Sequence, residues 1–534
     1  MALQDILLSI LPSRESGLGI MAAYYMLVLV FSWIAYQFVR ALWNISPFHP
    51  LSRIPGPRLA AATYLPEFYH DVVKFGRYTH EIGRMHEIYG PLVRINPDEV
   101  HCNDFRFIDE IYALGGRKRD KSPHQVNGSA MGTSTFGTSD HNLHRIRRIP
   151  VAKFFSRAQL AQLEPLIQRL AQRLCDKMLA QAGPFNLAMA YSCFTADAIS
   201  DYSFGESLGH LDQESWEPNY LQSQISILST VHIFRFFPFL NYIAAASPWF
   251  SNYLPRDTAL MIRTLNTTIP NMVKKVKISM EAGIERERPT VFAELLKSDL
   301  PEQEKTMTRL VNEATAIMGG GTGTTSWALS VITYHLLTKP KLLGKLTDEL
   351  RGAVSDPQNL PPWTTLEKLP YLDAVIQEGL RLSYGTSART ARVATEEDLV
   401  YRGEWKPEGS KKSVPLAYII PRGYAIGMST HLIHHDETLF PNSNEFTPER
   451  WLDANLEKRR EIEQHNLSFG KGSRMCFGMN LALCELYLGL TVLVLRVFPH
   501  MRLFETTEED IRYDYDIVIP MTSADSKGVR VVIV

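Results

Sequence analysis

Residues 17–39 form an apolar run, GLGIMAAYYMLVLVFSWIAYQFV, that contains no charged side chain. At about 1.5 Å per residue, a helix of this length crosses a hydrocarbon core of roughly 30 Å. A cleaved signal peptide would have a shorter apolar core and a small-residue cleavage site, whereas this run contains tyrosines and a tryptophan and is followed by Arg40. The run therefore predicts one transmembrane helix, with a buried core helix as the alternative.

The predicted anchor divides the chain into four parts. Residues 1–16 would be lumenal, residues 40–58 contain four prolines and would form a semi-rigid linker, and residues 59–534 would form one large domain. Arginines are more frequent after the anchor than before it, which places the large domain on the cytosolic side. These arginines are Arg40, Arg53 and Arg58.

Composition and periodicity indicate the class of the large domain. With an apolar fraction of 45% and a net charge of -1, the 534-residue chain predicts a folded body and lacks the basic footprint of a nucleic-acid binder. Its five cysteines include no CxxC pair, which argues against a disulfide framework or a zinc ribbon. Long helical patterns dominate and strand-like pieces are short, as in the two strands expected between 401 and 421. The predicted fold class is mainly α with a minor β portion (α+β).

One cysteine stands in an unusual loop, SFGKGSRMCFG, from Ser468 to Gly478. Glycines let backbone amides approach the sulfur of Cys476 closely, and a thiolate is a strong ligand for soft or borderline metals. Arg474 could neutralise an acidic group on the bound cofactor, while the apolar Phe469 could shield one side. This combination suits haem, a large flat cofactor with propionates, ligated by cysteine.

The loop residues Phe469, Gly472, Arg474, Cys476 and Gly478 reproduce the Phe-x-x-Gly-x-Arg-x-Cys-x-Gly signature of the cytochrome P450 family. The chain thus resembles a membrane-anchored, fungal-type haem-thiolate monooxygenase, and further motifs follow in the family's order along almost the whole chain. The resemblance implies the cytochrome P450 fold after a single transmembrane helix, and haem b (iron protoporphyrin IX) with Cys476 as its axial ligand. It also implies the endoplasmic reticulum membrane, with the catalytic domain in the cytosol.

Further family motifs imply structural and catalytic roles. Glu378 and Arg381 of EGLR, with Arg450 of FTPERW, match a Glu-Arg-Arg cluster that supports the core behind the thiolate loop. Thr324 in GGGTGTTS matches the threonine that hydrogen-bonds bound oxygen and steers protons to it, on a helix that the resemblance implies is kinked. The family usually has an acid just before this threonine, but this chain has Gly323. Proton delivery would then depend on the threonines, on waters or on a remote acid.

Three residues are predicted to hold the haem propionates. The stretch HNLHRIRR resembles a family helix with a Trp-x-x-x-Arg pattern, with His141 at the tryptophan position, Arg145 at the arginine position and His144 beside it. The stretch SARTARVA offers Arg389 and Arg392, of which the spacing favours Arg392. A guanidinium fork suits carboxylates, although an exposed surface arginine is the alternative.

The resemblance also implies the reaction and the partners. Dioxygen and electrons from NADPH, delivered by a separate NADPH–cytochrome P450 reductase in the same membrane lipid, would hydroxylate or otherwise oxidise a hydrophobic small molecule. Two stretches near the start of the large domain resemble those of fungal family members from secondary metabolism. This resemblance favours a terpenoid or polyketide intermediate as the substrate. The apolar stretch 225–250 would touch the membrane, line the substrate entrance or belong to the core. The alternatives are a haem-dependent isomerase or dehydratase, and a non-catalytic haem-binding membrane protein.

Overall fold

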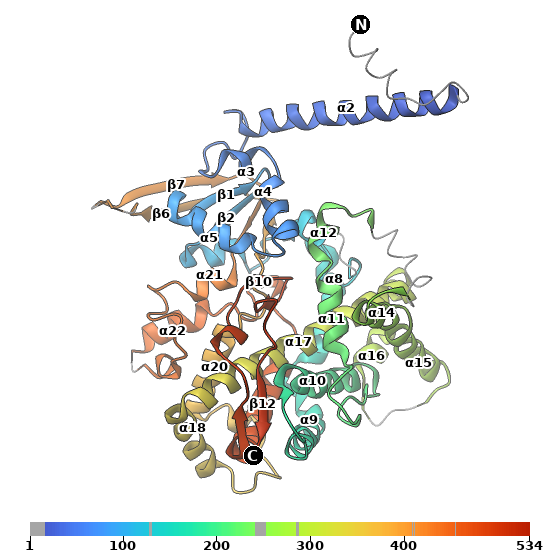
Figure 1. Ribbon diagram of the computed structural model, residues 1–534, viewed down its shortest axis with the longest axis vertical. Helices are drawn as coiled ribbons and strands as arrows, with labels where there is room; N and C mark the ends of the chain where they lie inside the picture. The colour runs from blue at the N-terminus through green and yellow to red at the C-terminus, as the bar shows by residue number, and fades with distance from the viewer. Residues whose placement is uncertain are drawn as a thin grey trace.

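The computed structural model describes residues 17–534 apart from 128–130, 241–252, 285–287, 408, 411 and 454. The predicted lumenal segment 1–16 and residues 241–250 of the apolar stretch 225–250 therefore lie outside the described residues. Helices dominate and strands are short, as the sequence predicts (Figure 1).

The α-helices that the structure describes, together with three of its short 3₁₀ and π helices, follow one another along almost the whole chain. In chain order they are α2 (Gly17–Ile45), α3 (Arg58–Ala62), α4 (Leu65–Phe68), η1 (Tyr69–Val73), α5 (Tyr78–Tyr89), α6 (Ile108–Ile111), α7 (Pro123–Val126), α8 (His141–Ala152), α9 (Arg157–Leu179), α10 (Leu187–Phe204), α11 (Tyr220–Leu228), α12 (Val231–Phe236), α14 (Arg256–Arg263), α15 (Ile269–Glu281), α16 (Val291–Lys297), α17 (Met307–Thr338), α18 (Pro340–Ala353), α19 (Trp363–Leu366), α20 (Pro370–Ser383), α21 (Thr430–His434), η7 (Pro448–Leu452), α22 (Leu456–His465), η8 (Gly472–Arg474) and α23 (Met479–Arg496).

The strands form four small sheets. They are β1 (Leu92–Asn96), β2 (Glu99–Cys102), β3 (Arg119–Lys121), β4 (Phe185–Asn186), β5 (Arg392–Ala394), β6 (Leu399–Trp405), β7 (Val414–Ile420), β8 (Ala425–Gly427), β9 (Met501–Leu503), β10 (Tyr515–Asp516), β11 (Pro520–Met521) and β12 (Arg530–Ile533). The largest sheet has the order β1-β2-β8-β5-β3 and includes one parallel pair, β2 with β8. The strands expected between 401 and 421 are confirmed as the antiparallel pair β6 and β7.

Helix α2 stands apart from the body, above the sheet that contains β1 and β2 (Figure 1). Its segment Met21–Ile45 is long and apolar enough to cross a membrane, and none of its most apolar window is buried against the protein. The helix continues past the predicted end at residue 39 to Ile45, because the first proline of the linker is Pro47. Among the described residues α23 passes the same length and composition test, but it is mostly buried and forms part of the core.

The long helix α17 organises the core of the body. It packs against α10, α20 and α23, and the largest hydrophobic cluster joins residues of all four helices. The helix is continuous over Met307–Thr338, and the kink that the family resemblance implies stays a prediction. One face of α17 lines the cavity that contains the candidate site.

Candidate active site

The loop between residues 467 and 478 holds the thiol of Cys476 at the wall of a cavity whose opposite wall is α17. The loop turns tightly at Gly472, where φ is +78° and an added Cβ would lie 2.3 Å from the carbonyl oxygen of Tyr112. The backbone N–H of Cys476 donates to the carbonyl of Phe469 at 2.8 Å, which fixes the direction of the thiol. Glycine is therefore required at 472 for both its backbone angle and its lack of a side chain.

Cys476 differs from the other cysteines in its surroundings. Its thiol is exposed in the cavity, whereas the other four cysteines are buried in the packed interior. Burial within the protein raises the pKa of Cys476, while the backbone N–H of Gly478 and the guanidinium of Arg148 oppose this rise. Without a metal the group is thus a thiol at neutral pH, and a metal ion would be needed to hold it as a thiolate.

Cationic side chains converge on the same cavity. Arg392 and Arg474, both predicted from the sequence, line it together with Arg148 and Lys121. None of these four forms an ion pair with an acidic residue that the structure describes. The backbone carbonyls of Arg119, Thr138 and Ser139 accept hydrogen bonds from Arg474.

The pKa values of these cations show their need for an anion. Burial, with the nearby Arg392, lowers the pKa of Arg474 to about 9. Burial also lowers the pKa of Arg392 and Arg148, and it lowers that of Lys121 well below its usual value. Buried cations without partners are costly, and two carboxylates would neutralise them. The cluster and the thiol together fit haem, because its iron accepts a thiolate and its propionates supply the missing negative charge.

The predicted propionate residues on α8 are placed differently from each other. His144 is buried and lines the cavity, whereas Arg145 is exposed and does not line it. Arg148 lies one turn beyond His144 on the same face and reaches the cavity. The arrangement thus favours Arg148 over Arg145, because Arg145 is rotated about 100° around the helix from His144. His144 and Arg148 are also separated by three residues, as are the tryptophan and the arginine of the family's Trp-x-x-x-Arg pattern. Aligning that pattern with His144 at its first position would have selected Arg148 from the sequence.

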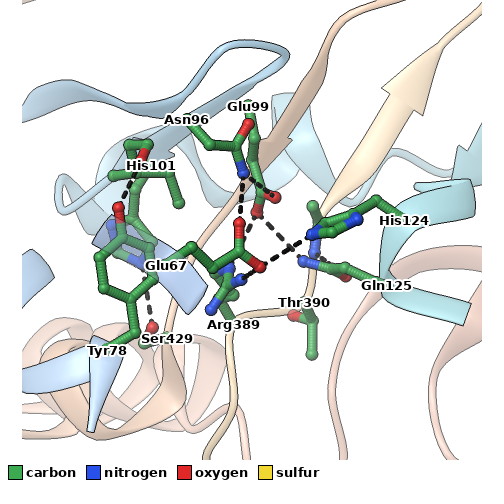
Figure 2. Close-up of polar contacts among 12 residues, drawn as sticks. Glu67, Tyr78, Asn96, Glu99, His101, His124, Gln125, Arg389, Thr390 and Ser429 are labelled. Atoms are coloured by element: carbon green, nitrogen blue, oxygen red, sulfur yellow. Dashed lines mark hydrogen bonds and ion pairs between the residues drawn. The ribbon is translucent and has the colours of Figure 1, made fainter. Parts of the chain in front are cut away.

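Arg389 is committed to other partners. It pairs with Glu67, with Asp71 at 3.3 Å and with Glu99 at 3.4 Å. Figure 2 shows the carboxylate of Glu67 between Arg389, His124 and the side-chain amide of Asn96. Arg389 therefore serves a buried ion network, which is consistent with the choice of Arg392 for the propionates.

This ion network also reaches the helix that borders the cavity mouth. Arg235 of α12 lies 3.0 Å from Asp71 and 3.3 Å from Glu67, and both arginines line the cavity. Burial raises the pKa of Glu67. Its cationic neighbours, above all Arg389 and His124, together lower the pKa by more than burial raises it, so the net pKa lies below its usual value. Sequence reasoning missed this network because its members come from α4, η1, β2, α12 and the segment after α20.

The predicted Glu-Arg-Arg cluster is present. Arg381 donates to both carboxylate oxygens of Glu378, at 2.9 and 2.8 Å, and Arg450 donates to the same carboxylate at 3.0 Å. Trp451 adds a donor at 2.9 Å, and Arg381 also donates to backbone carbonyls of the segment before η7. Burial raises the pKa of Glu378, but Arg381, Arg450 and the backbone N–H of Thr447 together lower it by more, so the carboxylate stays charged at neutral pH. The cluster joins α20 to η7 and has no contact with the cavity.

Thr324 lies on the cavity face of α17, as predicted. Its hydroxyl donates to the carbonyl of Gly320 at 2.8 Å. Gly323, at the place of the usual acid, faces α11 instead, and a Cβ there would lie 2.8 Å from the side-chain amide of Gln224. That amide donates to the carbonyl of Gly319 at 2.9 Å. The missing acid thus has a packing reason, because Gln224 fills the space that a longer side chain at 323 would need.

Glu485 of α23 is an acid that sequence reasoning did not select. It is 1% exposed and lines the same cavity, and neither of its carboxyl oxygens has a well-formed hydrogen bond to a described residue. Burial raises the pKa of Glu485 well above its usual value, an effect that the hydroxyl of Thr325 opposes. Burial thus favours the protonated form of Glu485.

Comparisons with known proteins define the class. The model of the family "Cytochrome P450" matches residues 71–521, so the chain belongs to the cytochrome P450 family. It is 45% identical over 446 residues to the cytochrome P450 monooxygenase ppzE of Metarhizium majus, covering 81% of this chain and 92% of that protein. It is 39% identical to the conidiogenone synthase PchP450 of Penicillium rubens and 35% identical to the N-acetyltryptophan 6-hydroxylase ivoC of Emericella nidulans. These matches cover 91% and 90% of this chain, and 94% and 92% of the two relatives.

The family and these relatives identify the chain as a cytochrome P450 monooxygenase, an oxidoreductase whose relatives are fungal enzymes. The family implies a haem-thiolate cofactor, as the loop signature predicts.

Proposed function

We propose that this protein is a membrane-anchored monooxygenase that oxidises a hydrophobic small molecule of fungal secondary metabolism, with Cys476 as the axial ligand of haem b. The observation that carries the proposal is the position of Cys476. Its thiol is the exposed one among the five cysteines, and it opens into a cavity that is also lined by cations without acidic partners among the described residues. A haem held by a thiolate supplies the activation of dioxygen and the insertion of oxygen into a C–H bond.

The chain's own residues would hold the cofactor and exclude water. Arg392, Arg474 and Arg148, with His144 and Lys121, would bind the two propionates. Burial lowers the pKa of His144 to about 2, so the imidazole is neutral and would act as a hydrogen-bond partner rather than a cation. Apolar side chains from α17, α10 and the thiolate loop would keep the space beside the cofactor dry.

Protons would be handled by hydroxyl groups and one buried acid. The hydroxyl of Thr324 donates a hydrogen bond to the carbonyl of Gly320. Rotation of this hydroxyl would direct its proton toward the cavity instead. Glu485 lines the cavity, its burial favours the protonated form, and it would serve as the remote acid that the absence of an acid at 323 requires. Thr325 lies between the two, since it neighbours Thr324 in the chain and interacts with Glu485.

Substrate and partners extend the proposal. The relatives include a conidiogenone synthase and an N-acetyltryptophan 6-hydroxylase, so related chains are named for different compounds. We favour a terpenoid or polyketide-derived substrate, with electrons from NADPH by way of NADPH–cytochrome P450 reductase. Helix α2 would anchor the enzyme in the endoplasmic reticulum membrane beside the reductase.

The test uses the full chain produced with its haem. The reduced enzyme with carbon monoxide should show the absorption band typical of thiolate ligation, and Cys476→Ser should abolish it. Cys484 is a buried cysteine of α23, eight residues after Cys476, so Cys484→Ser is the matched control and should keep the band. Substrate-dependent consumption of dioxygen with reductase and NADPH separates a monooxygenase from an isomerase or dehydratase. Survival of the band and of activity in Cys476→Ser would refute the assignment.

A further inference from the structure

Glu313 lies at the far end of the stripe that α17 presents to the cavity. Residues that recur at intervals of three and four share one face of a helix, and the cavity-lining residues of α17 follow this pattern. They are Glu313, Ala316, Ile317, Gly320, Gly321, Thr324, Thr325 and Ala328. Glu313 thus belongs to the cavity wall, although its carboxylate lies far along the helix from the residues at the thiolate end.

The two carboxylate oxygens of Glu313 have unequal surroundings. Oε2 accepts from the backbone N–H of Thr135 at 2.8 Å and from its hydroxyl at 2.9 Å, and it lies 2.5 Å from the guanidinium of Arg309. Oε1 is buried and has no hydrogen-bond donor among the described residues. The residue as a whole is 0% exposed. A buried acceptor without a donor is unfavourable, and a ligand that supplies the donor would remove that cost.

The charge around Glu313 is already balanced. Arg309 lies between Glu313 and Glu304, and Glu304 is held in turn by Arg147 through contacts of 2.7 and 2.8 Å. Two guanidinium groups and two carboxylates therefore form one neutral chain. A cationic ligand would add an uncompensated charge to this buried site, whereas a neutral N–H or O–H group would satisfy Oε1 without one.

The separation of Glu313 from Thr324 along α17 sets the length of a ligand that could reach both residues. Eleven residues separate positions 313 and 324, which corresponds to about 16 Å along a helix axis. A ligand that places one end near Thr324 and the other at Glu313 must span a distance of this order.

We propose that Glu313 Oε1 is a binding subsite for a neutral hydrogen-bond donor at the far end of the substrate. The substrate class is then an elongated, mostly apolar and uncharged molecule with one hydroxyl, amide or heteroaromatic N–H remote from the oxidised carbon. This inference rests on the proposed function, since it concerns the cavity beside the haem. Oε1 is covered from solvent, so the donor reaches it as part of a ligand that displaces neighbouring side chains of the cavity wall.

A pair of probes isolates the hydrogen bond. Decylpyrrole with its chain on a ring carbon carries one N–H donor. The corresponding decylfuran has nearly the same shape, with a weak acceptor oxygen in place of the N–H. Each is titrated into the purified holoenzyme, and binding is measured both by the haem spin-state shift and by thermal stabilisation of the protein. The wild-type enzyme should bind decylpyrrole about tenfold more tightly, the effect expected for a hydrogen bond to a charged acceptor.

Glu313→Gln should abolish or reverse that preference. The donors from Thr135 and Arg309 hold the amide oxygen at the Oε2 position, so the amide NH₂ replaces Oε1 and becomes a donor. Thr135→Val is the matched control, because it removes one donor to Oε2 and leaves Oε1 unchanged, so the pyrrole preference should persist.

The outcomes separate this inference from the proposed function. Equal binding of the two probes by the wild-type enzyme, or an unchanged preference in Glu313→Gln, would overturn the inference even when the thiolate-type carbon monoxide band is present. Loss of that band from the wild-type preparation would instead count against the proposed function. Thermal stabilisation still gives the ratio of the two affinities in that case, so the subsite is tested either way.

Discussion

Replacing Arg389 by methionine should destabilise the protein strongly. Arg389 is 7% exposed and faces three carboxylates, those of Glu67, Asp71 and Glu99. Arg235 alone would then remain as the arginine against them. Removing one partner from a buried ion pair leaves an uncompensated charge and typically costs about 3–5 kcal/mol. Solvent screening does not reduce this figure much, because the side chains of all three acids are at most 2% exposed.

The pH dependence of this loss tests its cause. In the wild-type protein the pKa of Glu67 is held below its usual value, against its burial, by Arg389 and His124. Its ionised form therefore contributes stability at neutral pH that is lost only as the pH falls through that low pKa. In Arg389→Met burial prevails, the pKa of Glu67 rises, and protonation relieves the unpaired charge. The stability difference between variant and wild type should thus be largest at pH 7 and should shrink toward pH 5.

The assay is guanidinium unfolding of the detergent-solubilised holoenzyme, followed by tryptophan fluorescence at several pH values. Arg422→Met is the matched control, because Arg422 is largely exposed and lies 4.0 Å from the exposed Asp398. Its loss should be between roughly 0 and 1 kcal/mol at every pH. A loss for Arg389→Met no larger than that of Arg422→Met, or one that does not change with pH, would refute the reasoning.

Three further predictions concern the thiolate loop and the cavity. Gly472→Ala should sharply reduce haem content in the purified protein, because its Cβ would meet the carbonyl of Tyr112 at 2.3 Å and its φ of +78° is strained for alanine; normal haem content would contradict this. Arg148→Ala should weaken haem retention against competition by apomyoglobin, whereas Arg145→Ala should not; equal effects would contradict the assignment of Arg148. Thr324→Ala should raise peroxide release per NADPH oxidised with little change in haem content, and unchanged coupling would exclude a role for its hydroxyl.

The thiolate loop and the helical class could be predicted because their determinants are local. The signature from Phe469 to Gly478 occupies one loop, and its glycines permit the positive φ angles that this loop needs at Gly470 and Gly472. The apolar run that became α2 and the strand pair β6 and β7 likewise follow from periodicity within single segments.

Which face a residue presents was decided by packing, and there local reasoning failed. Arg145 and Arg148 are alike in sequence, but α8 turns only Arg148 toward the cavity. Similarly, packing decides what the glycines of α17 face, because a Cβ at Gly321 would meet Ile199 of α10 and one at Gly323 would meet Gln224 of α11.

The sequence by itself thus indicated the candidate ligand Cys476, the fold family and the candidate anchor, since each depends on residues adjacent in the chain. The tertiary structure alone decided the partners of buried charge. Glu313 finds its donor in Thr135, and Arg389 finds Glu67, across 178 and 322 positions of sequence. The physical reason is that a buried charge is stabilised by whichever opposite charge or dipole packing brings to it, and sequence spacing carries no record of that contact.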